Sequence, residues 1–362
     1  MKHMKFLSFF LGVTFSIVAC SSNNEIIPVP DVDPDGDDGT TEVEFAKGAD
    51  IGWVTEYESK GYNFYNAKGE QRECTALMKE LGLNAIRIRV WVDPSKHGNW
   101  CNTADVVEKA KRAKELGMDV MIDFHYSDWW ADPAQQNKPA SWVGKNLANL
   151  KSAIKDHTVS VLQALKTIGV IPKWVQVGNE IRPGMLWDED VALSGASYNV
   201  TEKDLKDAPA SATDKVVYPM NWANLGAFVT TGYDAVKSVF PDAIVIVHLD
   251  NGWDSGLFTW FFDELKKNGG KWDMIGMSLY PYWSRDAKEG YSSADAVITD
   301  CISNIKALST KYNCDVMVVE TGMECADDNG KLASNSVLNE GKRQLARILT
   351  AVSYTHLRAH ET

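Results

Sequence analysis

The fold is decided by the stretch from residue 84 to residue 124, which reads NAIRIRVWVDPSKHGNWCNTADVVEKAKRAKELGMDVMIDF. Its two ends, 84–90 and 118–124, are short and mostly apolar, as strands of a parallel sheet are when both faces are buried. Between them, 104–116 repeats apolar residues at helical spacing, and Gly117 stands where a left-handed helix end favours glycine. The stretch therefore predicts a strand, a helix and a second strand of an α/β domain.

The same alternation continues on both sides of this stretch. We expect further strands at 49–53, 174–177, 243–248, 274–279 and 315–319. We expect further helices at 71–81, 143–168, 221–240, 257–267, 295–311 and 338–352. About seven strand–helix pairs in roughly 300 residues favour a (β/α)8 TIM barrel over an open sheet. A doubly wound sheet is the alternative, but no glycine-rich phosphate loop follows the first strand. We expect the last β/α unit to be missing from this chain.

Both ends of the chain are expected to lie outside the catalytic barrel, which we place at 45–351. Residues 1–20 are basic, then apolar, and end in a segment that resembles a bacterial lipobox, with Cys20 as the lipidated residue. A plain signal peptide with an incidental cysteine is the alternative. Residues 21–44 are acidic and contain prolines, as a flexible tether does. Residues 352–362, VSYTHLRAHET, show no helical or strand period and resemble a translated sequencing-library adapter.

The composition of the chain indicates which classes of molecule it can bind. The formal net charge of −12 argues against nucleic acid, because the electrostatic term would be repulsive. Thirteen tryptophans favour a glycan ligand, since flat aromatic rings stack on sugar faces, although tryptophan also fills cores. The cysteines after Cys20 are odd in number and lack metal spacing, so we interpret them as structural with undetermined pairing: Cys74, Cys101, Cys301, Cys314 and Cys325. No feature indicates an oligomer, and we expect a monomer that is exported and lipid-anchored to the bacterial outer membrane, on its periplasmic or cell-surface face.

Polar residues gather where the expected strands end, and two glutamates stand out among them. Glu180 follows one strand and Glu320 ends another. Hydrolysis of a glycosidic bond with retention needs two carboxyl groups about 5–5.5 Å apart, and two strand ends across a barrel mouth can set that gap. A single such glutamate would ordinarily be a solvated or salt-bridged residue. Asn179 supplies a donor for a sugar 2-hydroxyl, and Tyr280 is placed to donate to Glu320 and keep it ionised. Arg87 is expected, with Arg89, to lower the pKa of the nucleophile.

At these residues the chain resembles a known family. Its most specific segments are 87–94, 123–133, 176–181 and 319–321. They are similar to glycoside hydrolase family 53, the arabinogalactan endo-β-1,4-galactanases, over residues 47 to about 351. The resemblance implies a retaining (β/α)8 hydrolase with Glu180 as acid/base and Glu320 as nucleophile. The substrate-binding residues that we expect are Asn179, Asp128, Trp130, His125, Arg87, His248, Tyr280 and Trp91.

The implied substrate is the β-1,4-galactan side chain of pectin, which would be cut internally without any required cofactor. Bacterial members of the family can hold a structural Ca²⁺, for which Asp327, Asp328 and Asn329 offer oxygen ligands but no full set. Two other functions remain open. A retaining mannanase or β-glucanase of the same clan would differ at Asp128 and Trp130, and a non-catalytic glycan-binding lipoprotein would lack one carboxylate. A metal-dependent hydrolase would need a third ligand beside Asp123 and His125, and none has suitable spacing.

Overall fold

The computed structural model describes the chain over residues 45–187, 196–197, 220–281, 284, 293–323 and 334–359. The proposed lipobox, the tether and most of the long polar segment after Glu180 lie outside these residues. So do Cys325 and the calcium candidates Asp327, Asp328 and Asn329.

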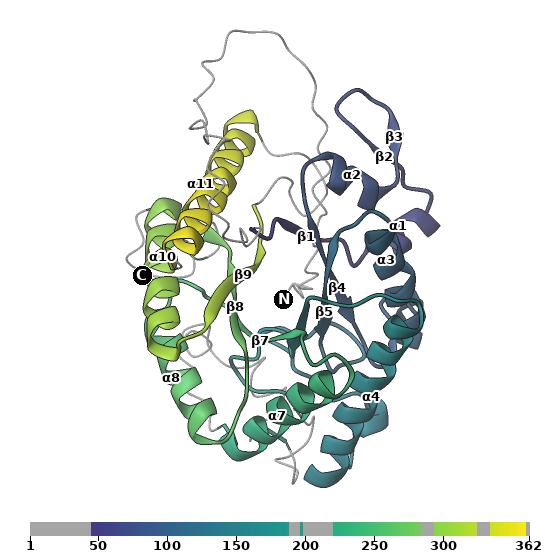
Figure 1. The fold of residues 1–362 in the computed structure, drawn as a ribbon, viewed down its shortest axis with the longest axis vertical. Helices are drawn as coiled ribbons and strands as arrows, with labels where there is room; N and C mark the ends of the chain where they lie inside the picture. The colour runs from purple at the N-terminus through teal and green to yellow at the C-terminus, as the bar shows by residue number, and fades with distance from the viewer. Residues whose placement is uncertain are drawn as a thin grey trace, which may run out of the picture.

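Seven parallel strands form a nearly closed barrel inside a ring of helices (Figure 1). Along the sheet their order follows the chain: β1 (Gly48–Asp50), β4 (Ala85–Val90), β5 (Asp119–Phe124), β6 (Trp174–Val177), β7 (Ile244–Leu249), β8 (Met274–Leu279) and β9 (Asp315–Thr321). β1 and β9 are the two edges of this sheet within the described residues. The TIM-barrel prediction is confirmed, with seven strands in place.

The helices cover the outer side of the sheet and alternate with the strands. They are α1 (Val54–Ser59), α2 (Cys74–Glu80), α3 (Thr103–Glu115), α4 (Leu147–Thr167), α7 (Trp222–Val239), α8 (Ser255–Lys267), α10 (Ala294–Tyr312) and α11 (Asn335–Ala359). Two short 3₁₀ helices, η1 (Pro94–His97) and η2 (Ala140–Trp142), lie in the loops after β4 and β5, and a hairpin of β2 (Phe64–Tyr65) and β3 (Gln71–Arg72) precedes α2.

Polar caps fix where these helices begin. The side chains of Asn102 and Asn146 accept the backbone N–H groups three residues on, which starts α3 and α4. Asp254 starts α8 in the same way. At the end of α3, Gly117 has a φ of +64°, as expected from its place after the last helical residue.

Four expectations for the elements were wrong in part. The strand expected at 49–53 is shorter, Gly48–Asp50, because Trp53 already caps the helix α1. Residues 71–72 are a strand, because they pair with Phe64–Tyr65, and the helix starts only after Glu73, whose carboxylate accepts the N–H of Ala76 at 2.8 Å. The long helix expected from 143 begins after its cap, Asn146. The last helix, expected at 338–352, extends from Asn335 through Ala359. The origin of residues 352–362 stays a prediction.

Two hydrophobic layers hold the barrel together. One lies between the strands and the outer helices, where side chains such as Ile86, Ile88 and Phe124 pack. A smaller layer fills the inside of the barrel and consists of Ala85, Met121, Trp174, Ile246 and Met274. The second layer forms the apolar floor on which the polar residues of the strand ends stand.

No helix in the described part of the chain is long and apolar enough to cross a membrane. The four described cysteines, Cys74, Cys101, Cys301 and Cys314, are free thiols.

Candidate active site

The candidate site is a second layer inside the barrel, two residues further along each strand than the apolar floor. Because side chains alternate along a strand, Arg87, Asp123, Gln176 and His248 point the same way as the floor residues two positions before them. Ser278 stands in the same relation to Gly276 on β8. A polar layer thus replaces the apolar one at the carboxyl ends of the strands, where chemistry sits in such barrels.

Glu320 joins this layer through an irregularity in β9. Met317 and Val319 pack against the apolar floor, so simple alternation would turn Glu320 outward. A register shift between β8 and β9 pairs Met277 with Val318 but Ser278 with Glu320, which gives β9 one extra residue. Such a bulge re-aims the side chains that follow it. The bulge therefore brings the carboxylate of Glu320 beside the other polar groups.

Glu180 is held in a strained turn directly after β6. Its φ is +47°, a region that non-glycine residues rarely adopt, and Gly178 before it has a φ of +82°. A Cβ on Gly178 would lie 2.5 Å from Cγ2 of Ile181. The turn is fixed from behind by Gln136, whose amide donates to the carbonyls of Asn179 at 2.7 Å and of Glu180 at 3.3 Å.

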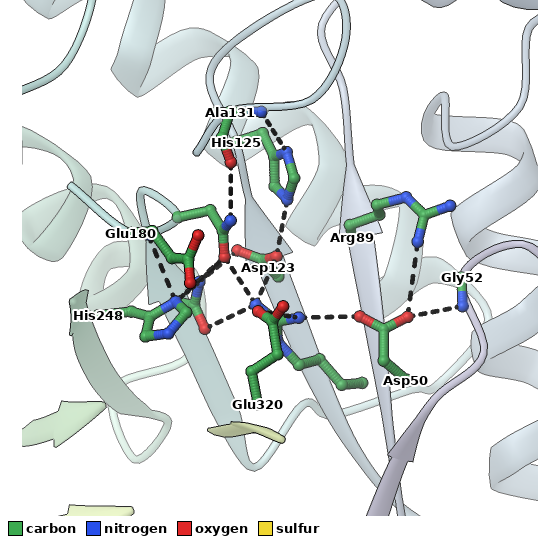
Figure 2. Close-up of polar contacts among 12 residues, drawn as sticks. Asp50, Gly52, Arg89, Asp123, His125, Ala131, Glu180, His248 and Glu320 are labelled. Atoms are coloured by element: carbon green, nitrogen blue, oxygen red, sulfur yellow. Dashed lines mark hydrogen bonds and ion pairs between the residues drawn. The ribbon is translucent and has the colours of Figure 1, made fainter. Parts of the chain in front are cut away.

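The two carboxylates come close together. A carboxylate oxygen of Glu180, one of Glu320 and a ring nitrogen of His248 all lie within 4.8 Å of one another. Figure 2 shows Glu180 and His248 next to each other, with the Glu320 carboxylate beside them. The structure therefore brings together the two glutamates that were singled out in the sequence.

The surroundings of the two glutamates differ. Burial raises the pKa of Glu180 well above its usual range, and the negative charges of Glu320 and Asp250 raise it further. Burial also raises the pKa of Glu320, but the positive charge of Arg87 and a hydrogen bond from Tyr280 oppose that rise. Glu180 consequently holds a proton more tightly than Glu320, whose charge is stabilised by Arg87 and Tyr280.

Both groups that stabilise Glu320 were expected from the sequence and are in contact with it. The hydroxyl of Tyr280 donates to Oε1 at 2.6 Å, and Nη1 of Arg87 lies 3.3 Å from Oε2. Arg89 was also expected to lower the pKa of Glu320, but it contacts other side chains. Arg89 lies 3.6 Å from Asp50 and its guanidinium stands 4.2 Å above the ring of Trp130, so it positions an aromatic side chain.

Arg87 links most of the polar layer. Its Nη1 lies 2.8 Å from Asp50 and its Nη2 lies 2.9 Å from Asp123, while Nη2 also donates to Oδ1 of Asn179 at 2.8 Å. Burial works against the charged guanidinium, but Asp123, Glu320 and Asp50 outweigh it and raise the pKa of Arg87. Arg87 and Arg89 together lower the pKa of Asp50, against the effect of burial. Arg87 is therefore permanently charged.

Several residues expected to bind substrate are instead engaged with the protein. His125 is buried, donates to Asp123 at 2.9 Å, and accepts the indole N–H of Trp91 at 3.2 Å. Asp128 accepts two backbone N–H groups, those of Asp93 at 3.0 Å and of Ala140 at 2.9 Å. These contacts tie the loops after β4 and β5 to each other.

Trp130 is more accessible than Trp91, which is buried. Trp130 is only partly buried, and Trp91 packs edge-on behind it with ring centroids 5.7 Å apart. Asn179 keeps a donor near the carboxylates, since its amide nitrogen carries two hydrogens and donates one contact, to the carbonyl of Ala131 at 2.7 Å.

Within the described residues, one group of three side chains has metal-type ligands close together, namely Glu180, His248 and Glu320. Both nitrogens of His248 are already in hydrogen bonds, with Ser278 at 2.8 Å on one side and Gln176 at 3.1 Å on the other. The chemistry of this group suits proton transfer better than metal binding, because neither ring nitrogen offers an unused lone pair.

Sequence reasoning missed Ser278 and Gln136. Ser278 donates to Oε1 of Glu180 at 2.6 Å. The sequence does indicate Ser278, because its hydroxyl stands alone in an otherwise apolar strand, two positions before Tyr280. Gln136 lies in a loop and carried no such signal.

Comparisons with known proteins show the family to which the chain is similar. The model of the family described as Glycosyl hydrolase family 53 matches residues 46–359. An uncharacterised protein from the bgaB 5′ region of Niallia circulans is 36% identical over 280 residues, which are 77% of this chain and 68% of that protein. An arabinogalactan endo-β-1,4-galactanase from Thermothelomyces thermophilus is 32% identical over 281 residues, which are 76% of this chain and 73% of that protein.

A solved structure described as one of two fungal β-1,4-galactanases has the same fold, with a TM-score of 0.69, 24% identity and 85% of each chain covered. The family model extends over nearly all of the barrel described above, including both glutamates and the layer around them. On this ground the chain belongs to glycosyl hydrolase family 53 and is a glycoside hydrolase.

Proposed function

We propose that the protein cuts β-1,4-galactosidic bonds inside galactan chains, with retention of anomeric configuration, using Glu180 as acid/base and Glu320 as nucleophile. The observation that carries this proposal is the contrast between the two carboxylates. They lie within 4.8 Å of each other, yet one has a pKa raised well above its usual range and the other faces Arg87 and Tyr280. Two carboxyl groups with opposite protonation are what an acid and a nucleophile require.

In the first step the Glu320 carboxylate attacks the anomeric carbon, and the bond from that carbon to the leaving oxygen breaks. Glu180 gives its proton to that oxygen. In the second step the Glu180 carboxylate takes a proton from water, whose oxygen attacks the same carbon and releases Glu320. The short separation of the carboxylates supports retention, because inverting enzymes keep about 6.5–9.5 Å between theirs to fit a water.

Two observations support the proposed substrate class. The relative from Thermothelomyces thermophilus is named an arabinogalactan endo-β-1,4-galactanase. In this chain, Trp130 is a partly exposed aromatic side chain of the kind on which sugar rings lie, and Arg89 stacks on its ring and holds it in place. A mannanase or β-glucanase activity would share both glutamates and would be separated from galactanase activity only by assay.

We also propose that the protein is exported and lipid-anchored through Cys20, and that it works as a monomer on a polysaccharide at the membrane. The sequence of the first twenty residues supports the anchor. A structural Ca²⁺ at Asp327, Asp328 and Asn329 remains a hypothesis from the family resemblance.

The test is release of reducing ends from linear β-1,4-galactan, beside β-mannan and β-glucan, by the chain without its first 22 residues. ¹H NMR of the earliest products reads the anomeric configuration directly. Glu180→Gln and Glu320→Gln should each abolish release, while Glu264→Gln, which changes a partly exposed residue of the outer helix α8, should not. Release from mannan or glucan alone would refute the substrate, and an α-configured first product would refute retention.

A further inference from the structure

A line of buried polar side chains lies behind Glu180. Gln176 is on β6, His248 on β7 and Ser278 on β8, so each comes from the next strand of the barrel. All three are fully or almost fully buried, with exposures of 0%, 0% and 1%. Their contacts run in sequence: Gln176 to His248 at 3.1 Å, His248 to Ser278 at 2.8 Å, and Ser278 to Glu180 at 2.6 Å.

The direction of the hydrogens along this line follows from the donors at its far end. The backbone N–H of Glu180 points at Nδ1 of His248 from 3.4 Å, and the amide nitrogen of Gln176 lies 3.1 Å from the same atom. A backbone N–H and an amide nitrogen can only donate, so Nδ1 accepts and the ring hydrogen is on Nε2. Oδ1 of Asn179 also lies 3.0 Å from Nδ1, but its two lone pairs already face two other donors, Nη2 of Arg87 at 2.8 Å and Nε2 of Gln176 at 3.1 Å.

The remaining steps are then fixed. Nε2–H of His248 donates to Oγ of Ser278, and Ser278 must use its single hydrogen for Oε1 of Glu180. The histidine cannot change this order by taking a second proton, because burial, together with the charge of Arg87, lowers its pKa well below the usual range. Oε1 of Glu180 is thus held by a donor, the Ser278 hydroxyl, whose direction is determined by His248 and Gln176.

We propose that Ser278 is a positioning residue that keeps the catalytic proton of Glu180 on Oε2, with His248 and Gln176 fixing the direction of its hydroxyl. A proton on Oε1 would face the serine hydrogen, so the neutral acid carries its proton on the other oxygen. The inference rests on the proposed function, in which Glu180 is the acid/base. When the proton has left, the same hydroxyl stabilises the carboxylate that receives a proton from water in the second step.

Two consequences distinguish this role from simple packing. Removal of the hydroxyl should harm only reactions that need proton donation, so a substrate with a good leaving group should be spared. Removal should also raise the pKa of Glu180, because the hydrogen bond from Ser278 lowers it. The alkaline limb of kcat/KM, where Glu180 loses its proton, should therefore move to higher pH although the enzyme is slower.

The experiment compares Ser278→Ala with the unaltered protein on phenyl and 2,4-dinitrophenyl β-1,4-galactobiosides. We expect kcat/KM to fall roughly 10- to 100-fold for the phenyl substrate and less than about 3-fold for the dinitrophenyl substrate, since positioned proton transfer contributes about 100- to 10,000-fold in all and the variant loses only part of that positioning. Ser278→Cys, which keeps the size with a weaker donor, should lie between. Ser238→Ala, which removes a hydroxyl bound to the carbonyl of Ala235 in α7, should change neither value.

A second measurement, of the pKa of Glu180, does not depend on catalytic turnover. In a Glu320→Gln background, ¹³C NMR of labelled glutamate carboxyls should show the Glu180 resonance, identified by its loss in Glu180→Gln, titrating at higher pH after Ser278→Ala. Equal losses on both substrates, or an unchanged titration, would overturn the proposal. Failure of the proposed function is a separate result, in which Glu180→Gln leaves galactan hydrolysis intact or the unaltered protein cleaves none of the galactosides.

Discussion

Replacement of Tyr280 by phenylalanine tests how the charge of Glu320 is maintained. The change removes one hydroxyl, which donates to Oε1 of Glu320 at 2.6 Å, and leaves the ring in place. Arg87 then remains as the positive group beside Glu320, 3.3 Å from Oε2. The hydrogen bond lowers the pKa of Glu320 against the effect of burial, so its loss should raise that pKa.

The magnitude follows from the type of hydrogen bond. A hydrogen bond to a charged group contributes about 1.5–3 kcal/mol, and each 1.4 kcal/mol changes a population tenfold. Only ionised Glu320 can attack the anomeric carbon. At pH values below the acid limb, kcat/KM of Tyr280→Phe should therefore fall roughly 10- to 100-fold. On the plateau, where Glu320 is ionised in either protein, the loss should be much smaller.

The assay is a kcat/KM profile on galactan from acid to alkaline pH for the variant and the unaltered protein. Tyr312→Phe is the matched control, because the hydroxyl of Tyr312 donates to the carboxylate of Asp263 at 2.9 Å at the end of α10. That end of α10 leads into the start of β9, whereas Glu320 lies near the end of that strand. An acid limb that does not move in Tyr280→Phe would refute this account of the nucleophile, and an equal loss at every pH would place the effect on the transition state instead.

Three further outcomes are expected. Gly178→Ala should lower the free energy of unfolding by about 1–3 kcal/mol more than Gly82→Ala in denaturant titrations, because both have positive φ but only Gly178 would place its Cβ against a side chain, at 2.5 Å. Asp250→Asn removes a negative charge that raises the pKa of Glu180, so the alkaline limb of kcat/KM should move to lower pH; no movement would contradict the assignment of Glu180 as the acid. His157 has a pKa lowered by burial to about 4, so the unfolded chain binds its proton more readily and stability is lost as pH falls from about 6.5 towards 4, by up to about 3 kcal/mol. His157→Leu should flatten that part of a thermal-unfolding pH series.

The strands and long helices were predictable because their signals are local. Buried parallel strands such as 84–90 and 274–279 show as apolar runs, and long helices show a repeat that many residues share. The elements that were missed are short and depend on partners. The hairpin exists because Gln71–Arg72 pairs with Phe64–Tyr65, and α1 has six residues with no polar cap before it.

The candidate site was predictable to the extent that its residues sit at strand ends. Glu180, Glu320 and Tyr280 could be placed at the barrel mouth because each follows or ends an apolar run. Their mutual contacts could not be read in the same way. The bulge that turns Glu320 inward is a property of pairing between β8 and β9, and a one-residue shift cannot be seen in either strand alone.

The two glutamates also show that residue type alone does not determine which carboxyl group acts as the acid and which as the nucleophile. Arg87 is shared among Asp50, Asp123 and Glu320, so its single positive charge cannot fully offset the burial of the nucleophile. A neutral donor such as the Tyr280 hydroxyl adds stabilisation to Glu320 without adding charge that would also act on its neighbour. The acid is tuned in the opposite sense by burial and by surrounding negative charge. A site in which several carboxylates share the nearby arginines can therefore favour the proton on one glutamate and the charge on the other through hydrogen bonds that select between them.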